Sequence, residues 1–258
     1  MLERQADTST FVAGADGCKG GWIVAATDSE DLGHPRVATV SAFQDIWTVF
    51  GAEPDVLAVD MPVGLVNNGS RRVDGIARKL LGKKSSSVFT PPERMLLEYA
   101  SLNNHLSDDR EGSYMDSYDA VNEWAQQFLG HGVPIQAFGI FPRIAEVDRY
   151  MTEERDPRVH ESHPELIFKR MNSDRVVADS KRAEEGQAAR AALLEQYVGV
   201  DAGAIEIQKT PGADAAVDDL HDALALMWAA ARINSGDAER IPKVVDLDPV
   251  GLDMAMWF

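Results

Sequence analysis

The stretch FVAGADGCKGGWIVAA, residues 11–26, decides the fold. Its first five residues are apolar and lead into Asp16, several glycines follow, and a second apolar run begins at Trp22. Two apolar runs joined by a glycine-rich turn predict two paired strands, at 11–16 and 22–26. A carboxylate at the end of a buried strand is costly unless it is paired or binds a metal ion. Asp16 is therefore the first candidate site residue, although an aspartate can also simply end a strand in a turn.

The next elements predict an α/β sheet with mixed strand directions. Residues 36–42 fit a third strand, 43–50 fit a short helix, and 56–59 fit an apolar strand that ends at Asp60. A helix crossing between strands implies that the last strand lies parallel to a neighbour. If that neighbour is the first strand, Asp16 and Asp60 meet at adjacent strand ends, where sites in open α/β sheets are found.

The remainder of the chain predicts one elaborated α/β domain over residues 1–258, with a helical insertion at 67–133. Flanking helices are expected on the sheet. The further expected elements are a strand at 134–141, a helix at 144–154, a strand or strand end at 160–168, a helix at 182–197, a short strand at 204–208, a helix at 218–234 and an edge strand at 252–257.

Composition limits the classes of partner. The chain has a formal net charge of −17, which argues against a general attraction to nucleic acid, so a local cationic patch or a metal ion must meet any anionic substrate. The acidity fits either high-salt adaptation or solubility. No apolar run approaches the roughly 20 residues of a membrane span, the first residues lack the apolar core of a signal peptide, and the single cysteine allows no internal disulfide. A cytoplasmic protein without membrane partners is the simplest interpretation.

The last predicted helix carries two more candidate acids. Asp219 and Asp222 are three residues apart at its start, which brings their side chains close together on a helix surface. Helix capping explains Asp218 well, but it explains Asp222 poorly, because that residue lies a turn inside. We therefore expect Asp16, Asp60, Asp219 and Asp222 to share one or more Mg²⁺ or Mn²⁺ ions, which prefer oxygen ligands.

Glu161 and His163 are further candidates. They alternate along a predicted strand and would share one of its faces. We expect a catalytic role for Glu161. His163 could relay protons, but the proline that follows it favours a hydrogen bond to a loop.

A basic segment could bind phosphate. Six cations lie within fourteen residues against the single Asp74: Arg71, Arg72, Arg78, Lys79, Lys83 and Lys84. The alternative is a solvated ladder of ion pairs worth under about 1 kcal/mol. In an acidic chain we expect Arg71, Arg78, Lys83 and Lys84 to contact substrate. Lys181 could also contact an anion.

Several segments together resemble a known family: GADGCKGGW from Gly14, DMPVGL from Asp60, SSVF from Ser86 with Pro91 and Pro92, the Glu161–Glu165 segment, and DDxxDA from Asp218. This pattern is similar to that of largely uncharacterised proteins described as predicted ribonuclease H-like nucleases, related to the Holliday-junction resolvases. The resemblance implies a ribonuclease H-like mixed sheet, with three antiparallel strands followed by parallel strands. It also implies two-metal hydrolysis of a phosphodiester, with Asp16 bridging both ions and Asp60, Asp219 and Asp222 completing the cluster.

One position departs from the pattern of those nucleases, and two other functions stay open. The acid of the fourth strand is often Glu in such enzymes but is Asp60 here. The first alternative is a nucleotide-binding phosphotransferase of the actin and sugar-kinase type, in which Asp16 and the nearby glycines would hold phosphates. The second is a non-catalytic binding module on the same fold.

Overall fold

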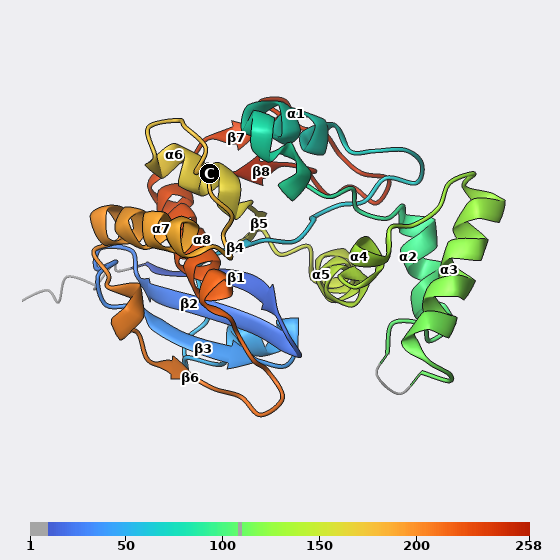
Figure 1. Cartoon of the computed structure of the whole chain (residues 1–258), viewed down its shortest axis with the longest axis horizontal. Helices are drawn as coiled ribbons and strands as arrows, with labels where there is room; N and C mark the ends of the chain where they lie inside the picture. The colour runs from blue at the N-terminus through green and yellow to red at the C-terminus, as the bar shows by residue number, and fades with distance from the viewer. Residues whose placement is uncertain (1–9, 108–109) are drawn as a thin grey trace, which may run out of the picture. The chain divides into compact units, whose positions relative to one another are not determined.

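The computed structural model describes residues 10–107 and 110–258, which form two compact units (Figure 1). Unit 1 comprises Met1–Asp60, Pro157–Glu239 and Trp257–Phe258. Unit 2 comprises Met61–Asp156 and Arg240–Met256, and it contains the insertion expected at 67–133. No helix in the described ranges is long and apolar enough to cross a membrane.

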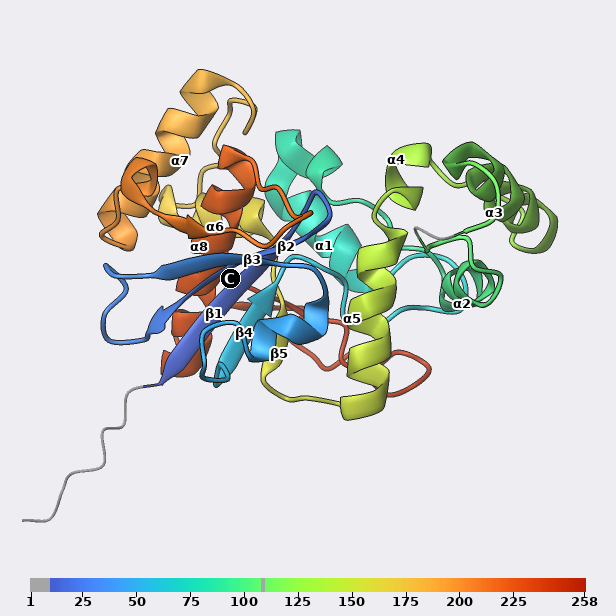
Figure 2. The same cartoon turned by 90° about the horizontal axis from the view of Figure 1, so that it is seen from below.

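Unit 1 is built on a six-stranded mixed sheet in the order β5-β4-β1-β2-β3-β6. The strands are β1 (Phe11–Cys18), β2 (Gly21–Asp28), β3 (Arg36–Val40), β4 (Val56–Val59), β5 (Val159–Glu161) and β6 (Ile207–Gln208). Strands β1, β2 and β3 are successively antiparallel, whereas β4 is parallel to both β1 and β5, and β6 is parallel to β3. The expected arrangement of antiparallel strands followed by parallel ones is confirmed, and Figure 2 shows β1 beside β4.

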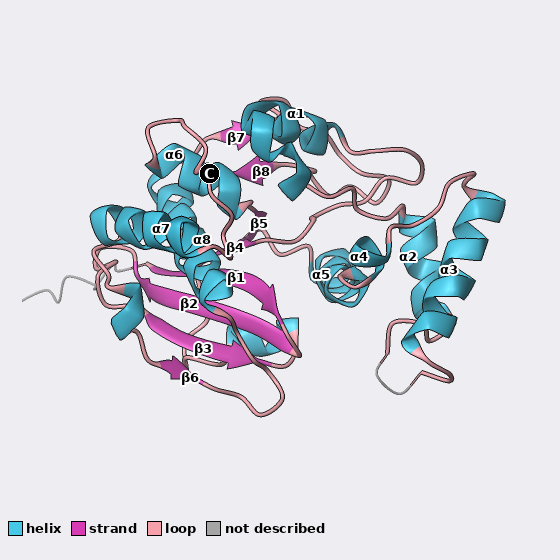
Figure 3. Ribbon diagram, in the orientation of Figure 1, coloured by secondary structure: helices cyan, strands magenta, loops and turns pink. Residues whose placement is uncertain are grey.

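Helix α8 (Val217–Ser235) packs on one face of this sheet, and α6 (Pro164–Met171) and α7 (Glu184–Tyr197) pack against α8 on the same side (Figure 3). The short 3₁₀ helix η1 (Phe43–Trp47) packs against β2 and β3. The Phe43 ring contacts Trp22 edge-on, at 5.3 Å between centroids. Because Trp22 stands opposite Gly17 in the β1–β2 register, its side chain points away from the face that carries Gly14. A second 3₁₀ helix, η3 (Ala202–Ala204), precedes β6.

Gly14 allows α8 to lie directly on β1. A Cβ atom at this position would stand 2.1 Å from the backbone nitrogen of Met227 and 2.5 Å from the carbonyl oxygen of Ala223. Nearly every side chain of α8 from Leu220 to Ala231 is buried. The glycine before Asp16 therefore brings the last helix down onto the first strand.

Unit 2 is mainly helical. Its elements are α1 (Arg72–Leu81), η2 (Gly82–Ser87), α2 (Arg94–Leu102), α3 (Tyr114–Phe128), α4 (Ile135–Phe138) and α5 (Phe141–Glu154), together with β7 (Arg240–Ile241), which pairs with β8 (Met256–Trp257). Buried Arg94 donates to Asp148 at 2.7 Å and to Asp248 at 2.6 Å, and this charge pairing ties α2 to α5 and to the C-terminal segment.

One strand prediction is wrong and a second is only partly confirmed. The segment 134–141 forms the short helix α4, whose amides at Ala137 and Phe138 bond back to the carbonyl of Pro134. A short apolar run does not distinguish a strand from a buried helix. The strand expected at 160–168 ends at Glu161, because Pro164 stands at the first position of α6, where proline is favoured.

Candidate functional site

Asp16 and Asp60 lie at the same level of two neighbouring parallel strands. Asp60 directly follows β4, as expected, whereas Asp16 lies inside β1, which continues for two more residues to Cys18. Ala15 is paired with Val59, and the amide of Asp60 donates to the carbonyl of Ala15 at 3.1 Å. Asp16 shares the strand face of Gly14, against which α8 packs. The two aspartates therefore face the same helix, as the sequence predicts.

The start of α8 brings a third carboxylate to this pair. Asp222 lies one turn inside the helix and is only 2% exposed. Asp219 instead caps the helix, because its carboxylate accepts the amide of Ala216 at 2.9 Å. The capping role expected for Asp218 thus belongs to Asp219, whose charge still acts on Asp16, although more weakly than those of Asp60 and Asp222.

These carboxylates are electrostatically strained. Burial, followed by the charges of Asp60 and Asp222, raises the pKa of Asp16 well above its usual value. Burial also raises the pKa of Asp60, while His163 and Lys181 oppose this shift. Burial raises the pKa of Asp222 to about 7, against the lowering effect of Lys181. Buried acids that repel one another favour a bound cation.

The ammonium of Lys181 is a cation that contacts these carboxylates. It lies between α6 and α7, donates to Asp222 at 2.6 Å and stands 3.8 Å from Asp218. Burial lowers the pKa of Lys181, but the carboxylates of Asp222, Asp16 and Asp60 outweigh this and hold it above its ordinary value. The sequence predicts that Lys181 contacts an anion, and the anion it contacts here is the chain's own.

The donor chemistry of this group fits Mg²⁺ or Mn²⁺, since its ligand atoms would all be carboxylate oxygens. They come from two central strands and from the first turns of a helix. Asp16, Asp60 and Asp222 would hold such an ion. In the described part of the chain no three acids, histidines or cysteines are arranged as metal ligands. Lys181 balances part of the group's negative charge through Asp222, so an ion and this ammonium would compete for the same oxygens.

Glu161 does not join this group. The β4–β5 register pairs it with Val59, so its side chain leaves the sheet on the face opposite Asp60. Strand β5 ends at Glu161, and His163 follows in extended backbone at the start of the next helix. That histidine caps α6, with its Nδ1 accepting the amide of Glu165 at 3.2 Å, and it lowers the pKa of Asp60.

Glu165 is the acid that the sequence reasoning missed. It lies in the first turn of α6, and its charge raises the pKa values of both Asp60 and Asp222. The signal was available, because a proline after a polar residue marks a helix start and therefore places the next residue in the first turn.

The predicted phosphate contacts lie in unit 2, and two of them already have partners. Arg71 is buried and bonds Asp74 at 2.6 Å and the carbonyl of Gly64 at 3.2 Å. Arg78 donates to the carbonyl of Val88 and the hydroxyl of Thr90. These contacts give both arginines a structural role. Lys83, which is exposed, and Lys84 lie in η2, which replaces the expected loop.

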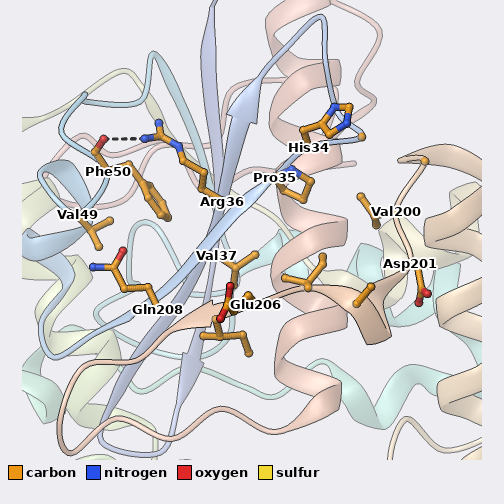
Figure 4. A pocket seen from close by; sticks show the side chains of 15 residues that line it. His34, Pro35, Arg36, Val37, Val49, Phe50, Val200, Asp201, Glu206 and Gln208 are labelled. Atoms are coloured by element: carbon orange, nitrogen blue, oxygen red, sulfur yellow. Dashed lines mark hydrogen bonds between the residues drawn. The ribbon is translucent and has the colours of Figure 1, made fainter.

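A separate hollow of about 880 Å³ lies in unit 1 beside β3 and β6 (Figure 4). The candidate acids do not line it. Its cation, Arg36, already donates to the carbonyl of Phe50 and stacks against the rings of Phe11 and Phe50. The carboxylate group is therefore the stronger candidate site.

Comparison with known proteins identifies a family. Residues 14–246 match the model of the family described as "Protein of unknown function (DUF429)". The chain belongs to this family. The match begins at Gly14 and includes every acid of the carboxylate group, so these residues fall within the DUF429 region. Searches of curated proteins and of solved structures gave no match.

Proposed function

We propose that this DUF429 protein is a metal-dependent phosphodiester hydrolase of the nuclease type, with a ribonuclease H-like arrangement of its sheet. The observation that carries the proposal is the convergence of Asp16, Asp60 and Asp222. They come from three separate parts of the chain and have pKa values raised by burial and, in part, by one another. Sites with buried acids of perturbed pKa are commonly functional. The order of antiparallel and then parallel strands supports the fold assignment.

A bound Mg²⁺ or Mn²⁺ would supply Lewis acidity and an activated water. The protein's own contribution is to hold the ion and position protons. When its ring is neutral, His163 carries its proton on Nε2, because Nδ1 accepts a backbone amide. In the protonated form of the ring, the charge of His163 lowers the pKa of Asp60. We propose that the Nε2–H group of His163 orients Asp60 and that His163 does not ligate the ion.

Nucleic acid or another phosphodiester is the proposed substrate. With a net charge of −17, the chain needs local positive charge to meet phosphate, and the metal would supply part of it. Lys83 and Lys84 remain proposed phosphate contacts.

The test is cleavage of DNA, RNA and bis(p-nitrophenyl) phosphate with Mg²⁺, with Mn²⁺ and with EDTA. We expect metal-dependent cleavage that Asp16→Asn lowers by at least about 10³-fold, a loss typical of a central electrostatic group. Lys169→Met, which removes a surface ion pair with Asp174, should leave the rate unchanged. A wild-type protein that binds the metal yet cleaves none of these substrates would contradict the proposal.

The contact between Lys181 and Asp222 favours one second candidate, a non-catalytic binding module in which the ammonium permanently neutralises the acids. This candidate predicts that saturating Mn²⁺ leaves the melting temperature unchanged. The hydrolase proposal predicts a rise, because a ligand that binds only the folded state stabilises it.

A further inference from the structure

The first turn of α6 stands next to the carboxylate group. Strand β5 runs parallel to β4, and the amide of Ser162 donates to the carbonyl of Val59 at 2.9 Å. Because α6 begins two residues later, Glu165 follows directly from the strand that flanks Asp60. All these residues belong to unit 1.

One oxygen of Glu165 is fixed by a buried arginine. Arg190, from α7, is completely buried and donates to Oε1 of Glu165 at 2.6 Å. The guanidinium also donates to the carbonyl of Gly186 at 3.0 Å and lies over the ring of Phe168. A charge-assisted bond to such an anchored donor holds the carboxylate in one orientation.

The other oxygen of Glu165 has no donor. Oε2 is buried and has no hydrogen-bond partner in the described residues. Glu165 as a whole is only 9% exposed. An unsatisfied buried polar atom costs about 1–3 kcal/mol, and more when it is charged, so such atoms require an explanation. The neighbouring carboxylates do not stabilise this oxygen, because the charge of Glu165 repels those of Asp60 and Asp222.

We propose that Glu165 is an additional carboxylate of the metal centre, which binds the divalent ion through Oε2, and that Arg190 is its positioning residue. This inference rests on the proposed function, because it requires an ion among Asp16, Asp60 and Asp222. It also assigns to Glu165 the site role that the sequence suggests for Glu161.

The experiment is calorimetric titration of the full chain with Mn²⁺, comparing wild type, Glu165→Gln and Glu161→Gln. Glutamine keeps an oxygen for Arg190 and removes the charge from the other arm. Loss of one ligand or of its positioning partner typically costs 10–100-fold in metal affinity. We expect a loss in this range for Glu165→Gln and a change below about twofold for Glu161→Gln. Arg190→Lys should also weaken Mn²⁺ binding, because it releases the fixed oxygen.

Wild-type affinity in Glu165→Gln, or a loss in Glu161→Gln alone, would overturn the assignment. If Glu165→Gln does not fold, Glu165→Asp keeps the charge beside Arg190, shortens the reach by one methylene and should show the same loss. The two proposals fail differently. Mn²⁺ binding that depends on Glu165, without cleavage of any phosphodiester, refutes only the hydrolase function. A wild-type chain that binds no Mn²⁺ refutes both.

Discussion

Replacing Lys181 with methionine should destabilise the metal-free protein and tighten its binding of Mn²⁺. The substitution removes the ammonium that bonds Asp222 at 2.6 Å and leaves the repelling carboxylates without their internal cation. Breaking a fully buried ion pair costs about 3–5 kcal/mol, but the Lys181 side chain is 36% exposed, so solvent screening reduces this to about 1–2 kcal/mol. For a chain of this size, that loss lowers the melting temperature in EDTA by roughly 2–8 °C.

With Mn²⁺ the variant should regain stability, because the ion no longer competes with the ammonium for the same oxygens. Recovery of about 1.4 kcal/mol would tighten Mn²⁺ binding about tenfold. The assay is thermal unfolding with EDTA and with increasing Mn²⁺, combined with calorimetric titration. Lys169→Met is the matched control, because its partner Asp174 lies 3.7 Å away at the surface. Weaker Mn²⁺ binding by Lys181→Met than by wild type would refute the competition.

Three further predictions follow from the same structure. Gly14→Ala should destabilise unit 1 by more than about 3 kcal/mol in urea unfolding, because its Cβ would overlap the backbone of α8, and unchanged stability would contradict the packing. Without metal, Asp16→Asn should be more stable than wild type at pH 8 and lose this advantage toward pH 4. The raised pKa of Asp16 means that the folded wild type keeps a proton which the unfolded chain has lost, so wild-type stability falls as pH rises from about 4 through the raised value; an advantage that is constant with pH would refute this. Mn²⁺ binding near pH 6.5 should release protons, because Asp222 has a pKa of about 7, and buffer-independent binding enthalpies would count against it.

The strands and the helix that carry the site could be predicted from the sequence. Apolar runs ending at Asp16 and Asp60, with a helix between them, predict neighbouring strand ends, and the structure pairs these strands in parallel. The apolar spacing after Asp222 likewise predicts the helix that packs over them. These inferences succeed because strand and helix periodicity are local properties of the chain.

The details of the site depend on contacts between distant residues. Alternation places Glu161 in the site, but its face is set by the register with β4, which the sequence does not specify. The approach of Lys181 to Asp222 and the burial of Arg71, whose partner Asp74 is only three residues away, are also tertiary events. A charged residue in sequence looks the same whether it will meet substrate or another side chain.

Anomalous diffraction from a crystal soaked in Mn²⁺ tests the central claim most directly. We predict a peak enclosed by the carboxylates of Asp16, Asp60 and Asp222, with the Lys181 ammonium moved away from Asp222. A crystal that shows no peak there at saturating Mn²⁺, with Lys181 still bonded to Asp222, would contradict the assignment of this group as a metal centre.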